Sequence, residues 1–427
     1  MKNSEYFNIK GSKSVNSEIE VSGNKNEALP VIAAALLTKE KVILRNIPAI
    51  EDTKIMIQIA KELGCVAEFE NNTLTIESSP LTTSSMNDNL SSKIRSSLLF
   101  VAPLLHRFKS VKLPNSGGDK IGKRRIDTHL DGFIKMGAKL ETERFHTLSI
   151  DKPQAVYHLF DEASVMATEN IIMFASLIEG KTTIYNAACE PHVQGLCNML
   201  SKMGVKFEGI GTNRLIINGV KQLSGVEHTI GSDHIETGSF IGLAASTNSN
   251  LRIKNSYTEH MDVIIPVFRK IGVSIEIDGN DILVDGTKER SIVSDYDGTI
   301  PVISDQPWPC FPADLTSIVV VTALFSKGTI VVHEKMFEAR LLFTDNLIRM
   351  GGKIVLCDPH RVVVNGPSKL KGIEMSSPDI RAGMALLIAA LAAKGSSTIR
   401  NIRQIDRGYQ DIDNRLKKAG FNIERKS

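Results

Sequence analysis

The sequence predicts an α/β protein of two similar domains, and three observations support this fold class. The chain has 427 residues, which is longer than one hydrophobic core usually serves. A short pattern recurs six times at intervals of about 70 residues, too long for a stacked solenoid. Several helices are apolar on nearly every face, as expected for helices buried at the centre of a domain.

Each copy of the repeat combines the end of an amphipathic helix, a glycine and an alternating, strand-like run. The copies read KELGCVAEFE, FIKMGAKLE, LSKMGVKFE, FRKIGVSIE, LIRMGGKIV and LKKAGFNIE. The glycines stand where a left-handed C-cap would end the helix, and they are Gly64, Gly137, Gly204, Gly272, Gly351 and Gly420. One such glycine is a common turn, whereas six in order predict six α/β units, three in each domain.

An apolar helix and then a strand precede the amphipathic helix in several copies. The helices include EALPVIAAALL, ENIIMFASLIEG and AGMALLIAALAAKG, and the strands include KVILRNIP, KTTIYNAA, NLRIKNS and STIRNIR. We expect three such helices to form a shared core in each domain.

The composition favours a cytoplasmic enzyme. A net charge of +3, with 23% charged and 5% aromatic residues, does not indicate a nucleic-acid-binding surface or a charged tail. The five cysteines are scattered without a C-x-x-C pair, so we expect free thiols rather than disulfides or a zinc site. The opening MKNSEYFNIKGSKS has no apolar segment typical of a signal peptide, and we expect no association with a membrane.

Six cations predict a site for a small, highly charged anion. Lys25 lies where VSGNKNEALP opens an apolar helix, a position that favours anions. Arg95 and Arg381 fall in the first turn of other apolar helices, where a cation opposes the helix dipole unless an anion is bound. Each cation alone is more often a surface ion-pair residue, but all six occupy equivalent places in different repeats and can converge if the domains face one another. They are Lys25, Arg95, Arg124, Arg340, Arg381 and Arg407.

Two isolated carboxylates accompany these cations: Asp119 in NSGGDKIGKRR and Asp314 in CFPADLTS. Carboxylates among many cations suit general acid–base chemistry on a phosphorylated substrate. No cluster of Asp, Glu and His has metal-ligand spacing, and no P-loop, dinucleotide-binding or nucleophile-elbow motif occurs. We therefore expect neither a metal nor an organic cofactor.

The chain resembles the enolpyruvyl transferases along nearly its whole length. The resemblance rests on eight segments in the family's order: SGNKNEALP, GGDKIGKRRIDTHL, ATEN, DHIETGSF, FPADL, FEARLLFTDNLIRMG, DIRAG and IDRGY. Each segment is weak alone, and together they are highly specific. The branch that acts on UDP-N-acetylglucosamine in peptidoglycan synthesis is the most similar. The Lys-Ser pair and the Gly-Asn-Ala-Gly-Thr stretch of the shikimate-pathway branch are absent.

The resemblance implies the enolpyruvyl transferase fold, in which each of two domains is an inside-out α/β barrel of three βαβαββ-like repeats. One domain would span residues 25–231 and carry a mobile catalytic loop. Residues 1–24 and 232–427 would form the other domain, with the active site in the cleft between the two.

The resemblance also implies the reaction. The 3-hydroxyl of the amino sugar adds to C2 of phosphoenolpyruvate, C3 gains a proton, and phosphate leaves the tetrahedral intermediate. Both substrates are small molecules, and no cofactor or obligate protein partner is implied.

The implied residue roles divide by the part of the substrate that is held. Residues matching the phosphate ligands of phosphoenolpyruvate are Lys25, Arg124 and Arg407, and those near its carboxylate are Arg340 and Arg381. Asn26 and Asp314 match the groups that hold the amino sugar, and Asp314 would act as base or orienter of its 3-hydroxyl. The nucleotide path would include Arg95, Asp127, His129, Ser164 and Val165, and the remaining substrate-binding positions are Met336 and Phe337.

The chain departs from the family pattern at several positions, most of them on the nucleotide side. They are Glu162, Met166, Cys189 and Met336. Enolpyruvyl transfer to another uridine nucleotide is therefore one alternative, and an inactive paralogue that binds UDP-sugars is another. The retained cations count against the inactive paralogue, because a simple UDP-sugar binder would not need a phosphoenolpyruvate site.

The loop position of Asp119 usually carries a cysteine in the family. A free thiol, with a pKa of about 8.5, is protonated at neutral pH, whereas a free aspartic acid, with a pKa of about 3.9, is ionised. Asp119 could donate a proton only where desolvation and bound phosphates favour its neutral form. We expect the neutral form of Asp119 in a closed, liganded complex, with Gly117 and Gly118 as the hinge of the loop. Asp379, which matches a carboxylate beside the reacting carbon, is the rival proton donor. Without a thiol at 119, we expect insensitivity to fosfomycin, which alkylates that thiol in the family.

Overall fold

The computed structural model describes residues 5–119, 121–142, 146–256 and 258–427. Its contacts divide the chain into two units. Unit 1 comprises Met1–Ser22, Asp119–Lys123 and Ser232–Ser427, and unit 2 comprises Gly23–Gly118 and Arg124–Gly231. Lys120, one of the cations that follow Asp119, lies outside the described residues.

Unit 1 contains three four-stranded sheets among its described residues. In spatial order the strands are β15 (Ser274–Asp278), β16 (Asp281–Asp285), β14 (Asn250–Lys254) and β2 (Asn16–Glu20) in one sheet, β17 (Val302–Ser304), β18 (Gly328–His333), β20 (Arg361–Gly366) and β19 (Ile354–Asp358) in the second, and β21 (Glu374–Ser376), β22 (Ser396–Arg400), β1 (Tyr6–Lys10) and β23 (Asn422–Lys426) in the third. The helices are α8 (His234–Ser246), α9 (Ile265–Lys270), α10 (Thr316–Ala323), α11 (Thr344–Arg349), α12 (Ile380–Ala392), α13 (Arg403–Asp406) and α14 (Ile412–Lys418), with 3₁₀ segments η3 (Thr258–Val263) and η4 (Ala313–Leu315).

Unit 2 repeats this plan, with one sheet of three described strands. Its strands are β13 (Val226–Thr229), β3 (Val42–Arg45), β5 (Thr73–Glu77) and β4 (Val66–Glu70), then β6 (Ser110–Lys112), β8 (Thr147–Ser149) and β7 (Lys139–Glu141), and then β11 (Lys206–Glu208), β12 (Arg214–Gly219), β10 (Gly180–Tyr185) and β9 (Tyr157–Leu159). The helices are α1 (Lys25–Ala34), α2 (Glu51–Glu62), α3 (Asp88–Ser91), α4 (Val101–Phe108), α5 (Asp127–Lys135), α6 (Val165–Ala175) and α7 (Pro191–Lys202), with 3₁₀ segments η1 (Ala35–Leu37) and η2 (Arg95–Phe100).

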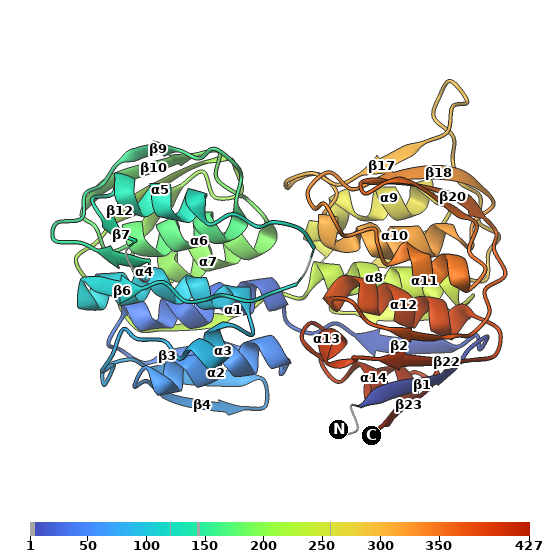
Figure 1. Cartoon of the computed structure of the whole chain (residues 1–427), viewed down its shortest axis with the longest axis horizontal. Coiled ribbons are helices and arrows are strands. Elements are labelled where there is room, and N and C mark those ends of the chain that lie inside the picture. Colours follow the sequence, from blue (N-terminus) through green and yellow to red (C-terminus); the bar gives the residue numbers. More distant parts are fainter. Residues whose placement is uncertain (1–4, 120, 143–145, 257) are drawn as a thin grey trace. The chain divides into compact units, whose positions relative to one another are not determined.

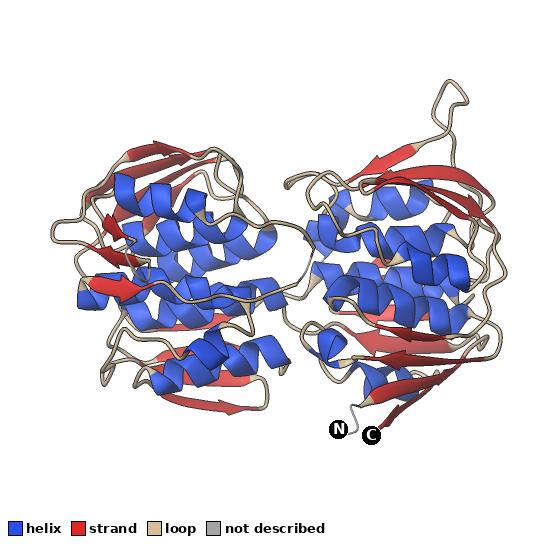
Figure 2. Ribbon diagram, in the orientation of Figure 1, coloured by secondary structure: helices blue, strands red, loops and turns tan. Residues whose placement is uncertain are grey.

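Within each unit the apolar helices lie at the centre, with the sheets outside them (Figure 1 and Figure 2). In unit 1, α8, α10 and α12 pack against one another, and α8 and α10 are buried along their whole length. A helix that is apolar on every side has no face to present to water, so it belongs in the interior. The inside-out arrangement is confirmed, although the described strands form separate open sheets and do not close into a barrel. None of the helices within the described ranges is long and apolar enough to cross a membrane.

All six repeat glycines have positive φ angles, between 85° and 116°. At each one, the glycine N–H bonds to the carbonyl three residues earlier, as Gly64 does to Lys61. The next residue bonds to the carbonyl five residues before it, as Cys65 does to Ala60. These paired bonds define the Schellman motif, in which a left-handed glycine ends the helix. The predicted left-handed cap is therefore confirmed in every copy.

The strand that follows the buried helix is closed by an asparagine in four repeats, an arrangement we call the Asn clamp. These residues are Asn46, Asn186, Asn255 and Asn401, and all have left-handed φ angles. Each side-chain amide donates across to the end of the parallel neighbouring strand, and the acceptors are the backbone carbonyls of Ile230, Phe160 and Ser377 and the Glu20 carboxylate. The Asn clamp thus joins the two parallel strands of a repeat where both end.

Candidate active site

The predicted site residues form two groups, one in each unit. Those in unit 1 are Asp119, Asp314, Met336, Phe337, Arg340, Asp379, Arg381 and Arg407, and those in unit 2 are Lys25, Asn26, Arg95, Arg124, Asp127, His129, Ser164 and Val165.

Asp314 joins two guanidinium groups of unit 1. It lies in η4. Its Oδ1 accepts a hydrogen bond from Arg340 Nη2 at 3.1 Å, and its Oδ2 lies 2.9 Å from Arg381 Nε and 2.8 Å from Arg381 Nη2. The arginine side chains are only 4% and 5% exposed, whereas the Asp314 side chain is 27% exposed. The carboxylate is therefore the accessible member of this cluster, and it holds both arginines in fixed orientations.

Asp379 caps α12 at the start of the same cluster. Its Oδ1 accepts the N–H groups of Arg381 and Ala382, each at 2.9 Å. Burial raises the pKa of Asp379, and the charge of Asp119 adds to this rise, while the Ala382 N–H and the charge of Arg340 oppose it. A carboxyl group with a raised pKa suits proton exchange near neutral pH. Asp379 thus stays a rival of Asp119 for that task.

Asp119 forms an ion pair with Arg407. Asp119 Oδ1 lies 2.5 Å from Arg407 Nη1, and the two side chains are 17% and 13% exposed. A second bond ties the same loop to unit 1, because Ala339 N–H donates to the Ile121 carbonyl at 3.1 Å. These contacts explain why Asp119–Lys123 belongs to unit 1, whereas the sequence expectation kept the whole of 25–231 in the other domain.

The two glycines before Asp119 have steric reasons to be glycine. Gly118 has a φ of +120°, and a Cβ there would lie 2.3 Å from Arg124 Nη2. A Cβ on Gly117 would lie 1.9 Å from the Ser92 carbonyl oxygen. These close approaches explain why both positions carry glycine in the observed conformation. Their role as a hinge stays a prediction.

Lys25 opens α1, as predicted, but it is buried rather than solvated. Asn24 caps the helix by accepting the N–H groups of Asn26 and Glu27. Lys25 is 6% exposed, and its Nζ lies 2.9 Å from Asp52 Oδ2. A buried ammonium needs such a counter-ion because desolvation of an isolated charge is costly. Asp52 was not singled out from the sequence, where EDTKIM reads as an ordinary first helical turn.

Arg95 opens an apolar helical segment, as predicted, but its first turns are the 3₁₀ segment η2, which runs directly into α4. Its Nη2 donates to the carbonyl oxygens of Arg124 at 3.0 Å and Arg125 at 2.8 Å. Burial lowers the pKa of Arg95 to about 10, and the charge of Arg124 contributes. Arg95 therefore fixes the backbone that carries Arg124.

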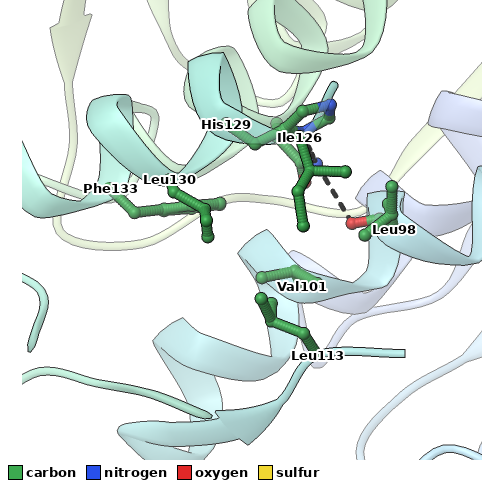
Figure 3. A pocket seen from close by; sticks show the side chains of 8 residues that line it. Leu98, Val101, Leu113, Ile126, His129, Leu130 and Phe133 are labelled. Atoms are coloured by element: carbon green, nitrogen blue, oxygen red, sulfur yellow. Dashed lines mark hydrogen bonds between the residues drawn. The ribbon is translucent and has the colours of Figure 1, made fainter. Parts of the chain in front are cut away.

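His129 is a buried, neutral imidazole on α5. Asn170 Nδ2 lies 3.0 Å from both the Leu98 carbonyl oxygen and His129 Nδ1 (Figure 3). Since a carbonyl oxygen only accepts, the Asn170 amide must donate at this end, so His129 Nδ1 accepts and the proton lies on Nε2. Burial lowers the pKa of His129 to about 3, and the charge of Arg95 adds to this. The ring also lines a small apolar pocket with Leu98, Val101, Leu113, Ile126, Leu130, Phe133 and Asn170.

The remaining residues of the predicted nucleotide path lie at the starts of two helices. Asp127 begins α5, and Ser164 precedes Val165, the first residue of α6. Asp161 links the two helix starts, because its carboxylate accepts a hydrogen bond from Thr128 Oγ1 at 2.8 Å and lies 3.3 Å from Arg125 Nη1. The first N–H groups of a helix have no acceptor within it and favour an anion.

Two features of the site regions were not anticipated from single residues. Glu169, in the ATEN segment, is 2% exposed, and burial raises its pKa well above the usual value, with the charge of Glu190 adding to the rise. Phe337 lies beneath Arg340, whose guanidinium carbon is 4.8 Å from the ring centroid. The sequence signal that could have identified Glu169 is the presence of a glutamate inside an apolar helix.

Within the described ranges, no three His, Cys, Asp or Glu side chains are placed to hold a metal ion.

Comparison with protein families gives a match over residues 9–416 to the model described as EPSP synthase (3-phosphoshikimate 1-carboxyvinyltransferase). Among curated proteins, the chain is 49% identical to the UDP-N-acetylglucosamine 1-carboxyvinyltransferase of Treponema denticola over 419 residues, which is 98% of both chains. It is also 49% identical to the protein of that name from Borreliella burgdorferi over 418 residues, again 98% of both.

Solved structures share the fold at lower sequence identity. The enolpyruvyl transferase NikO from Streptomyces tendae superposes with a TM-score of 0.88 at 20% identity, covering 99% of both chains. An EPSP synthase from Acinetobacter baumannii gives a TM-score of 0.75 at 16% identity, covering 100% of both. At such identities the likeness concerns the fold, and the predicted two-domain α/β architecture is confirmed.

Proposed function

This chain belongs to the enolpyruvyl transferase family, and we propose that it transfers the enolpyruvyl group of phosphoenolpyruvate to the 3-hydroxyl of UDP-N-acetylglucosamine, releasing phosphate. The proposed enzyme is a UDP-N-acetylglucosamine 1-carboxyvinyltransferase, with peptidoglycan synthesis in the cytoplasm as its setting. Two relatives of that name at 49% identity over nearly the full chain support this acceptor.

The observation that carries the proposal is the alternation of guanidinium and carboxylate groups in unit 1. Arg340 and Arg381 converge on Asp314, and Arg407 pairs with Asp119. Guanidinium groups bind carboxylate and phosphate oxygens in the same fork geometry. We assign the carboxylate of phosphoenolpyruvate to Arg340 and Arg381 and its phosphate to Arg407. Lys25 and Arg124 of unit 2 would supply further phosphate ligands.

The ion pair between Asp119 and Arg407 suggests how an aspartate could replace a thiol as the acid. A phosphate that binds Arg407 competes with the Asp119 carboxylate for the same guanidinium. Once displaced, Asp119 loses its cation and faces the negative phosphate, and both changes favour its protonated form. Asp119 would then donate a proton to C3, while Asp314 orients or deprotonates the sugar hydroxyl.

A phosphate-release assay tests the proposed function. The purified chain is incubated with phosphoenolpyruvate and either UDP-N-acetylglucosamine or UMP, and the nucleotide product is identified by mass. We expect phosphate and an enolpyruvyl adduct with UDP-N-acetylglucosamine alone. Turnover with UMP would instead favour the alternative acceptor. Binding of UDP-N-acetylglucosamine without phosphate release would favour the inactive paralogue.

A further inference from the structure

One repeat of unit 1 closes its parallel strands without an Asn clamp. β18 ends at His333, which is paired in register with Ser304 at the end of β17. The next residues are Glu334, at the position that the clamp asparagine fills elsewhere, and Asp305, at the position of Ile230 in a clamped repeat. In a clamped repeat of unit 2, for example, Arg45 is paired in register with Thr229, and the next residues are Asn46 and Ile230.

The two acids hold a run of three backbone N–H groups. Asp305 Oδ1 accepts the N–H of Lys335 at 2.5 Å, and Oδ2 accepts that of Met336 at 3.3 Å. Glu334 Oε1 accepts the N–H of Phe337 at 3.1 Å. Asp305 is 1% exposed and Glu334 is fully buried. The buried side chains of Asp305 and Glu334 therefore fix the backbone at the start of the segment Lys335–Arg340.

The same segment carries Arg340 and touches the Asp119 loop. Glu334 Oε2 lies 3.8 Å from Arg340 Nε, and neither atom has a hydrogen-bond partner among the described residues. Arg340 stacks over Phe337, and Ala339 N–H donates to the Ile121 carbonyl. A shift of this segment would therefore move the guanidinium and the loop together.

Two carboxyl groups buried side by side cannot both be ionised without a large cost. Burial raises the pKa of Glu334 to about 9, the Asp305 carboxyl adds to the rise, and the charge of Arg340 opposes it. With its pKa raised in this way, Glu334 holds its proton at neutral pH. Since an uncharged asparagine closes the same position in four other repeats, the fold itself does not require acids here.

We propose that Asp305 and Glu334 are positioning residues that hold the Lys335–Arg340 segment, and with it the Arg340 guanidinium, for the carboxylate of phosphoenolpyruvate. The inference rests on the proposed function, because that function gives Arg340 its ligand. The charged and titratable groups facing Glu334 are Asp305 after β17, Arg340 on its own segment, and His360, whose Nδ1 lies 2.9 Å from the Glu334 carbonyl oxygen.

Substitution kinetics test this role. Glu334→Gln keeps a planar, uncharged group that still accepts the Phe337 N–H, so KM for phosphoenolpyruvate at pH 7.5 should stay within about threefold of wild type. Asp305→Ala removes the carboxylate that accepts two backbone N–H groups and should raise that KM by roughly 10-fold to 100-fold, with a smaller change in kcat, because small displacements of a ligand-orienting group are costly.

The pH dependence separates positioning from general structural damage. As the pH rises through about 9, Glu334 loses its proton, two adjacent carboxylates repel, and KM for phosphoenolpyruvate should rise in the wild type. Glu334→Gln should lack this alkaline rise. The matched control is Asn186→Ala, which removes an Asn clamp in unit 2 and should lower the melting temperature while leaving the alkaline rise intact.

A measurement without turnover keeps this inference separate from the proposed function. The difference infrared spectrum of wild type minus Glu334→Gln at pH 7.5 should show the carbonyl stretch of one protonated carboxyl group, lost by pH 10. Absence of that band would overturn the protonated state of Glu334, even in an inactive protein. An alkaline rise that persists in Glu334→Gln, or a normal KM in Asp305→Ala, would overturn the positioning role. Failure of wild type to release phosphate would reject the proposed function alone.

Discussion

The cations of unit 1 and unit 2 differ in the partners that hold them. In unit 1, Arg407 pairs with Asp119, and this acid is itself a predicted site residue whose side chain is 17% exposed. In unit 2, Lys25 pairs with Asp52, whose side chain is 5% exposed and which has no predicted role in the reaction. In the proposed reaction a substrate anion displaces Asp119 from Arg407, whereas Asp52 stays in place as the counter-ion that holds the Lys25 ammonium.

The difference suggests that the two ion pairs affect different properties, one mainly the reaction and the other mainly the stability of the fold. An ion pair that keeps some contact with water costs less to break than a fully buried one, because water can solvate the charge that remains. A buried pair is costly to break, because the remaining charge stays desolvated. Substitutions in the Asp119 pair should therefore change turnover more than stability, and substitutions in the Lys25 pair should change stability strongly.

The largest expected effect follows from replacing Asp119. Asp119→Asn removes both the proton and the negative charge that pairs with Arg407, and kcat should fall by roughly 100-fold or more, since general acid catalysis typically contributes 10²–10⁴-fold. The melting temperature should change little. Steady-state phosphate release and thermal unfolding of the same preparation provide the two measurements.

Asp119→Cys is the matched variant, because it restores a protonated donor at neutral pH. We expect it to recover turnover and to become inactivated by fosfomycin with time, while the wild type remains insensitive. Near-normal kcat in Asp119→Asn would dismiss Asp119 as the acid and leave the task to Asp379. An active but fosfomycin-insensitive Asp119→Cys would mean that the thiol is not placed at the reacting carbon.

An intermediate effect is expected at the buried pair of unit 2. Asp52→Asn leaves the Lys25 ammonium without its carboxylate, and the free energy of unfolding should fall by about 2–4 kcal/mol. Urea denaturation measures this loss. Asp88→Asn is the control, because Asp88 pairs with Lys112 at the surface, where the side chains are 61% and 35% exposed, and should cost less than about 1 kcal/mol. Equal losses in the two variants would contradict the distinction between scaffold and exchangeable pairs.

Much of the fold could be predicted because it repeats. The same helix-ending glycine, with a left-handed φ, recurs at Gly64 and at five further positions, so the pattern can be recognised in the sequence. Helices without a polar face can likewise be predicted to be buried. The cations of the site could be found for a related reason, since a charge inside an apolar helix such as Arg381 conflicts with its surroundings and needs an explanation.

The partners of those cations could not be predicted in the same way. Asp52, Asp305 and Glu334 belong to segments of ordinary composition, and their importance comes from contacts that only folding creates. Arg95 shows a different limit, because the sequence does not separate a 3₁₀ segment from the first turn of an α-helix. The sequence therefore showed which charged residues are unusual, but only the structure showed which residues they pair with.

The smallest expected effect concerns His129, a third kind of site residue that is buried but uncharged. Its pKa is lowered to about 3, below the value of about 6.5 for a free histidine. In that window the unfolded chain binds a proton that the folded chain does not, so the contribution of His129 to stability is complete above pH 6.5 and falls as the pH is lowered. The loss should approach about 1 kcal/mol between pH 7 and 5.5 relative to His129→Asn. Urea denaturation of both proteins across this range measures the difference, and NMR resonances of His129 that titrate between pH 5 and 8 would show that the ring is charged and solvated instead.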